Sequence, residues 1–65
     1  MNGKLEIRIL NYLNDRYNPS TTIKCINSIS MIDGYYRVEA NIIEHFTSGI
    51  HFTDTSIFFI DKEEV

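Results

Sequence analysis

The chain has 65 residues, a net charge of −3 and a single cysteine, and these values limit both its fold and its function. A chain this short forms one domain, residues 1–65, whose core contributes only about 3–5 kcal/mol to the free energy of folding. Because Cys25 is the single cysteine, no internal disulfide can form, and we expect homodimer formation to add stability. The six basic residues form no stripe along the chain, so we expect no nucleic-acid partner.

The first segment carries apolar side chains at helical spacing. Leu5, Ile9 and Leu13 recur every fourth residue, which places them on one side of a helix. Pro19 is a natural stop, because the residue before a proline avoids the helical region. In the alternative interpretation residues 4–10, KLEIRIL, form a strand, since apolar and charged residues also alternate there. The helix accounts for more of the segment.

Asp33-Gly34 lies between two runs rich in β-forming residues and predicts a hairpin. A type I′ turn needs positive φ at both central positions, which Asp and Gly tolerate. This turn predicts a complete register: Met31 opposite Tyr36, Ile29 opposite Val38, Asn27 opposite Ala40, Cys25 opposite Ile42, and Ile23 opposite Glu44. Most strongly apolar residues of both strands then share one face, which a slip of one residue would destroy.

In this register Cys25 and Asn27 both point into the core. A core-facing cysteine behaves as a small hydrophobe, and burial disfavours its reactive thiolate. A core asparagine requires hydrogen-bond partners, since leaving its amide unsatisfied costs about 1–3 kcal/mol. We therefore expect structural roles for both residues.

The segment FTSGI predicts a second hairpin. Thr47, Ser48 and Gly49 suit a three-residue loop in which the glycine adopts the left-handed conformation. The resulting register places His45 directly opposite His51. The polar run TDTS, residues 53–56, interrupts the apolar alternation and predicts a bulge or bend.

These elements define an α+β fold in which one N-terminal helix packs on a three-stranded antiparallel meander, in the order α-β-β-β. The sheet face away from the helix is unusually apolar, which is typical of an interaction surface; its residues are Ile26, Ile32, Tyr35, Ile43, Ile57 and Phe59. We expect dimerisation to extend the sheet through an edge strand or to cover this face. Residues 62–65 are expected to form a frayed acidic tail.

The histidine pair is the weaker candidate site. His45 and His51 could approach a metal together, but a zinc site needs three or four ligands. No nucleophile motif or phosphate-binding loop is present, and the three glycines are isolated. We therefore expect no metal, no cofactor and no catalysis, and the pair either responds to pH or has no role.

Aromatic residues beside an arginine are typical anchors of protein interfaces. The sequence accordingly predicts a non-catalytic, self-associating protein that binds or inhibits a larger protein partner through Tyr35, Arg37, Ile43, Ile57 and Phe59. The alternative is a small-molecule or nucleotide-binding module with a pocket at a protomer interface, whose polar groups come from Tyr12, Asn27, Arg37 and the two histidines. No motif ties the chain to a known family.

Charged residues from Lys4 onward interrupt any apolar run near the first residue, so we expect no signal peptide. The longest apolar run, residues 57–60, is too short to cross a bilayer. We therefore expect a cytoplasmic protein without a membrane partner. The abundance of Ile, Asn, Tyr, Phe and Lys suggests an AT-rich genome and a bacterial or phage accessory protein.

Overall fold

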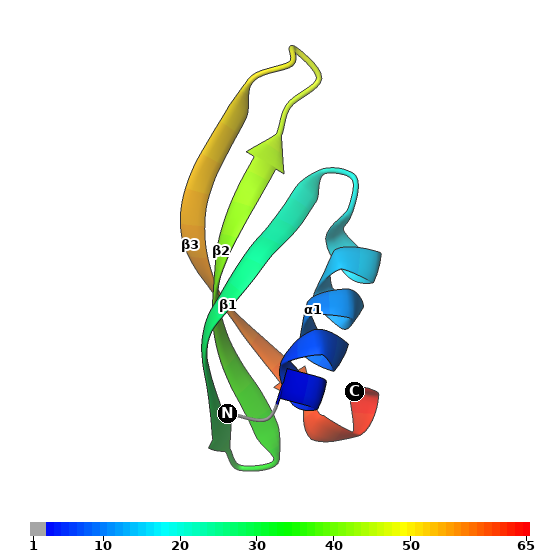
Figure 1. The fold of residues 1–65 in the computed structure, drawn as a ribbon, viewed down its shortest axis with the longest axis vertical. Coiled ribbons are helices and arrows are strands. Elements are labelled where there is room, and N and C mark those ends of the chain that lie inside the picture. Colours follow the sequence, from blue (N-terminus) through cyan, green and yellow to red (C-terminus); the bar gives the residue numbers. More distant parts are fainter. Residues whose placement is uncertain (1–2) are drawn as a thin grey trace.

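The computed structural model describes residues 3–65 and shows one helix packed against a three-stranded sheet (Figure 1). The elements are α1 (Gly3–Tyr17), β1 (Thr21–Ile32), β2 (Tyr35–His45), β3 (His51–Asp61) and the short 3-10 helix η1 (Lys62–Glu64). Adjacent strands are antiparallel and follow the order β1-β2-β3. The predicted α+β fold with the order α-β-β-β is confirmed.

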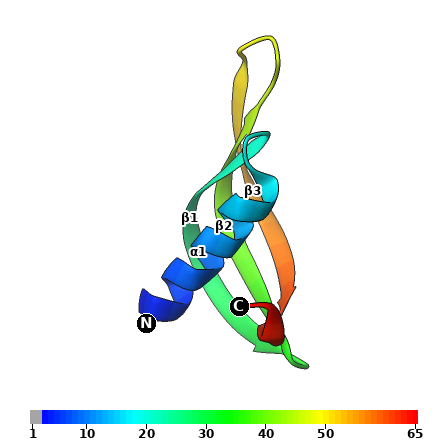
Figure 2. The same ribbon diagram turned by 90° about the vertical axis from the view of Figure 1, so that its right-hand side faces the viewer.

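Helix α1 runs diagonally across one face of the sheet (Figure 2). Residues 4–10 belong to this helix, so the alternative strand assignment is wrong. Ile9 and Leu13 are buried against the sheet, and Leu5 packs at the edge of the same cluster. The helix therefore forms because its apolar stripe has a sheet to cover.

The side chain of Asn14 ties the helix to β1. Its Oδ1 accepts a hydrogen bond from the backbone N–H of Ile23 at 2.8 Å, and its Nδ2 donates to the carbonyl of Ile23 at 3.3 Å. Both backbone polar groups of Ile23 are thus satisfied by one amide from the helix. This contact positions β1 beneath α1.

The first hairpin has the predicted turn. Asp33 and Gly34 have φ values of 47° and 82°, as a type I′ turn requires. From the turn the register follows the prediction as far as Ser28, which pairs with Glu39. The Asp33-Gly34 prediction is therefore confirmed for the half of the hairpin near the turn.

Beyond Ser28 the predicted register is wrong, because β1 contains two register shifts. The first lies between Ile26 and Ser28, and the second lies between Ile23 and Cys25. Each bulge inserts one unpaired residue into β1 and changes which side chains point to the helix.

The bulges exchange polar and apolar residues between the two faces. Ile26 was expected on the uncovered face but packs against the core, opposite Ala40. Asn27 and Cys25 were expected in the core, yet both are exposed. Burying Ile26 in place of Asn27 removes apolar surface from water and leaves the amide solvated, which explains the shift.

The second hairpin pairs without interruption from Tyr35 opposite Asp61 to His45 opposite His51. Its loop closes as predicted, with Gly49 at a φ of 88°. Of the bulge or bend expected in residues 53–56, the described strand contains no bulge, so that part of the prediction is wrong. Residues 51–55 are exposed on both sides of the strand, so polar residues there need no interruption of the pairing.

The core lies between α1 and one face of the sheet. Among residues 3–65 the buried hydrophobic residues are Ile9, Leu13, Ile23, Val38, Ala40, Ile42 and Ile60. The acidic residues that follow β3 form η1, where Asp61 accepts a hydrogen bond from the backbone N–H of Glu63 at 2.9 Å. Val65 packs against the core, which gives this tail an anchor.

We predict that Leu13→Ala lowers the free energy of unfolding by about 2–4 kcal/mol, most of the stability of so small a core. Leu13 is only 1% exposed, so truncation leaves a cavity beneath the helix. The matched control is Ile7→Ala, on the same helix but 58% exposed, which should change stability by no more than about 0.5 kcal/mol. Urea denaturation followed by circular dichroism measures both, and equal effects would contradict the described helix orientation.

Candidate interaction surface

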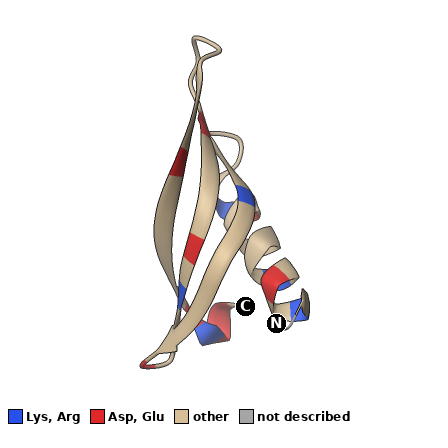
Figure 3. Cartoon of the chain, turned by 60° about the vertical axis from the view of Figure 1, so that its left-hand side comes forward, with Lys and Arg blue, Asp and Glu red and all other residues tan. Residues whose placement is uncertain are grey.

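The sheet face opposite α1, here called the outer face, carries the strand side chains that do not enter the core. At one end of it four apolar residues are exposed, and Phe59 is the most exposed at 65%. This group, the apolar patch, consists of Ile32, Tyr35, Ile57 and Phe59. Figure 3 shows that the strands carry few charged residues. This exposed apolar cluster makes the outer face the candidate interaction surface.

The residues predicted to bind a partner all belong to the outer face. Arg37 pairs with Phe59 and Glu39 with Ile57 across β2 and β3, which places Arg37 inside the apolar patch. Ile43 lies on the same face but farther along β2, paired with Thr22 and Thr53. The structure therefore brings together four of the five predicted residues, and Ile43 lies apart from them; the four are Tyr35, Arg37, Ile57 and Phe59.

Arg37 and Glu39 are two charged residues of this surface, and Asp61, paired with Tyr35, lies at its edge. Arg37 and Glu39 are two residues apart on β2, so their side chains are neighbours on one face, and both are half-buried. Within residues 3–65 neither side chain forms a hydrogen bond or an ion pair. A half-buried charge next to Ile57 or Phe59 gains from a partner of opposite sign.

A polar network crosses the middle of the outer face and separates the apolar patch from Ile43. Asn41 accepts hydrogen bonds from Asn27 Nδ2 at 2.9 Å and from the Thr55 hydroxyl at 3.2 Å. Its Nδ2 donates to Cys25 Sγ at 3.5 Å. Asn27 therefore satisfies its amide on the solvent side of the sheet, not beneath the helix as expected.

The two histidines meet at the far end of the outer face. The Nδ1 atoms of His45 and His51 are 2.8 Å apart, and the rings are nearly perpendicular, at 82°. Nε2 of His45 lies 2.7 Å from the Thr22 hydroxyl oxygen. The predicted proximity of the pair is confirmed, and each contact requires one donor and one acceptor.

Asn14, in helix α1, determines which group donates and which accepts in each of these contacts. Asn14 Oδ1 accepts from the backbone of Ile23, which fixes the orientation of that amide. Asn18 Nδ2 donates to the same oxygen at 3.0 Å, so Asn18 Oδ1 is left to accept from the Thr22 hydroxyl at 3.3 Å. Thr22 has only one hydroxyl hydrogen and gives it to Asn18.

It follows that the Thr22 oxygen accepts from His45, so neutral His45 carries its hydrogen on Nε2. Nδ1 of His45 is then an acceptor, and His51 must donate from its own Nδ1. The two imidazoles share a single hydrogen at this contact. Protonating both rings would place hydrogens on both facing nitrogens and break the contact.

Among residues 3–65 the histidine pair has no third His, Cys, Asp or Glu with which to hold a metal ion. Thr22, on the other side of His45, offers a hydroxyl that is not a usual zinc ligand. The arrangement of His45 and His51 is that of a hydrogen-bonded pair.

Sequence reasoning missed an apolar group at the tip of the β2–β3 hairpin. Phe46 and Phe52 form an edge-to-face pair 5.5 Å apart, and both are exposed together with Ile50. Figure 1 shows this tip extending past the end of α1. Element lengths could have revealed it, because a 15-residue helix spans about 22 Å and an 11-residue strand about 36 Å.

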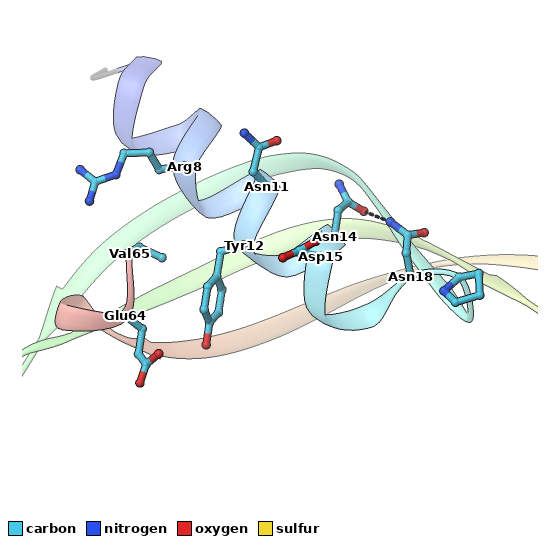
Figure 4. A pocket seen from close by; sticks show the side chains of 9 residues that line it. Arg8, Asn11, Tyr12, Asn14, Asp15, Asn18, Glu64 and Val65 are labelled. Atoms are coloured by element: carbon cyan, nitrogen blue, oxygen red, sulfur yellow. Dashed lines mark hydrogen bonds between the residues drawn. The ribbon is translucent and has the colours of Figure 1, made fainter.

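An open groove lies on the helix side of the molecule, opposite the outer face, between α1 and the C-terminal residues (Figure 4). Its lining residues are Arg8, Asn11, Tyr12, Asn14, Asp15, Asn18, Pro19, Glu64 and Val65. Tyr12, expected to contribute to a ligand pocket, lies here. Arg37, Asn27 and the histidine pair belong to the outer face, so one protomer does not bring these polar groups into a common pocket.

Comparison with known proteins gives no relative: no protein-family model, no curated protein and no solved structure matches the chain. Between residues 3 and 65 there is no helix long and apolar enough to cross a membrane.

We predict that neutral His45 carries its hydrogen on Nε2 and that neutral His51 carries its hydrogen on Nδ1. Two-bond ¹H–¹⁵N correlation spectra of the neutral rings distinguish these tautomers directly. Thr22→Val removes the acceptor of His45 Nε2–H and should relax the preference, whereas Thr53→Val leaves that contact in place. Finding the hydrogen of His45 on Nδ1 in the unsubstituted protein would contradict the donor chain.

Proposed function

We propose that this protein is a non-catalytic interaction module that binds a larger protein, and inhibits it where the two surfaces meet, through the apolar patch and Arg37. The observation that supports the proposal most strongly is the exposure of Ile32, Tyr35, Ile57 and Phe59 on the side of the sheet opposite the core and α1. Apolar and aromatic residues around an arginine are the composition that protein interfaces favour at their centres.

The charges near the patch favour a protein over a nucleic acid. Arg37 lies beside Glu39, and Asp61 is paired with Tyr35 at the edge of the patch. An acidic surround would repel phosphates, although tyrosine and phenylalanine on a sheet can stack on bases. We place this activity in the cytoplasm of a bacterial cell, as that of a bacterial or phage accessory protein, because the single thiol and the residue composition suit that setting.

We predict that Phe59→Asp abolishes partner capture. The immobilised chain is exposed to a lysate of the cells that encode it, and enriched proteins are quantified by mass spectrometry. A carboxylate at the most exposed position of the patch should reduce enrichment of the specific partner by at least about tenfold.

The control for this experiment is Ile7→Asp, which places the same charge at a similarly exposed apolar position on the helix, away from the patch. It should capture the partner as the unsubstituted chain does. Circular dichroism checks that both variants are folded. Equal capture by Phe59→Asp and the unsubstituted chain would contradict the proposed function.

A further inference from the structure

We propose that the apolar patch is the contact surface of a symmetric homodimer, in which Arg37 of each copy pairs with Glu39 of the other. This inference rests on the proposed function because it uses the same interaction surface, and it adds a second copy of the chain as an occupant of that surface. Its basis is the pattern of charge, apolar surface and hydroxyl groups along the three strands of the outer face.

Two sheets packed face to face can be related by a two-fold axis that lies between them and crosses the strands. Consider such an axis over the row formed by Ile29, Val38 and Phe58, which are neighbours across the three strands. Each strand then faces the same strand of the other copy, running in the opposite direction. The residue that precedes this row in sequence therefore faces the residue that follows the row in the other copy. The surface is self-complementary if the residues that face each other in this way match on every strand.

On β2 the residues flanking the axis are Arg37 and Glu39, so each guanidinium faces a carboxylate: Arg37 meets Glu39 of the partner subunit. On β3 the flanking residues are Ile57 and Phe59, so an apolar side chain faces Phe59 of the partner subunit. The same symmetry provides two ion pairs beside two apolar contacts. Both charges gain the partner that they lack within one copy.

The third strand agrees with the other two. On β1 the flanking residues are Ser28 and Ser30, so a hydroxyl faces Ser30 of the partner subunit. One row farther out, Asn41 faces Tyr35 of the partner subunit, where an amide and a phenol can form a hydrogen bond. Each strand thus places chemically matched groups opposite one another.

The other simple symmetry is disfavoured by charge. A two-fold axis parallel to the strands and above β2 would place Arg37 against Arg37 of the partner subunit, and Glu39 against Glu39 of the partner subunit. Like charges brought together in a contact that excludes water weaken binding. The alternation of sign at Arg37 and Glu39 therefore selects the axis that crosses the strands.

The available area sets the strength of the dimer. Three strands about 4.8 Å apart, with four rows about 6.8 Å apart on one face, cover roughly 400 Å² on each copy. The two copies together therefore contribute roughly 800 Å² of flat area. Because protruding side chains add to this area, the total surface buried approaches roughly 1,000 Å², the lower limit for a specific interface. The dimer should therefore dissociate on dilution and reform at high concentration.

Charge exchange tests the pairing directly. Sedimentation equilibrium of the purified full chain should show a mass that rises from 7.6 kDa toward twice that value with concentration. Arg37→Glu and Glu39→Arg, made separately, should each raise the dimer dissociation constant at least about tenfold. The double variant Arg37→Glu/Glu39→Arg keeps the net charge and should return to within about threefold of the unsubstituted value.

Mixing the two single variants gives a second readout. Arg37→Glu carries carboxylates at both positions 37 and 39, and Glu39→Arg carries guanidinium groups at both. A heterodimer of the two variants therefore regains both ion pairs. An equimolar mixture should therefore associate more tightly than either variant alone. Circular dichroism confirms that each variant retains its fold.

The proposal is overturned if the chain sediments at 7.6 kDa up to millimolar concentration, or if neither single reversal weakens the dimer. It is also overturned if the double variant fails to restore association. A monomeric chain that still captures a partner in a Phe59-dependent manner would refute this dimer and leave the proposed function standing. A dimer that depends on the charge pair, with capture unaffected by Phe59→Asp, would support this dimer and refute the proposed function.

Discussion

The strict alternation of side chains along β2 is the constraint on which the rest of the structure depends. β2 pairs on both sides, so its residues must point in turn toward α1 and away from it. One helix can cover only one of these faces, and Val38, Ala40 and Ile42 occupy it. The apolar residues on the neighbouring positions remain uncovered. The fold and the candidate interaction surface are therefore two consequences of a single strand register.

Much of this register could be predicted from short local signals. Asp33-Gly34 and the loop ending at Gly49 impose positive φ at positions where these residues accept it, and each turn sets the pairing next to it. The two bulges in β1 could not be predicted in the same way. Nothing local marks Asn27 as an inserted residue, since the choice depends on whether Ile26 or Asn27 packs beneath a helix distant in sequence.

The same difference separates the parts of the candidate site that were predicted from those that were not. Tyr35, Arg37, Ile57 and Phe59 lie on two strands that pair without a shift, so counting from the turns places them correctly. Cys25 and Asn27 lie beyond a bulge, so counting placed them in the core when they are exposed. The hydrogen direction within the histidine pair depends on Asn18 and Thr22, which tertiary packing brings together. The exposed hairpin tip follows from the difference in length between α1 and the strands.

The most direct test of the account is the set of side-chain nuclear Overhauser effects between helix α1 and the sheet, measured in a ¹³C-edited spectrum at low protein concentration. The structure predicts effects that connect Ile9 and Leu13 to the other members of the buried cluster, Val38 and Ile60 among them, and none from Ile9 to Phe59, whose side chain lies on the outer face. It also predicts cross-strand effects that place Ile23 opposite Ile42. Effects between Ile9 and Phe59, or Cys25 opposite Ile42, would show that a different face is covered and would contradict the account.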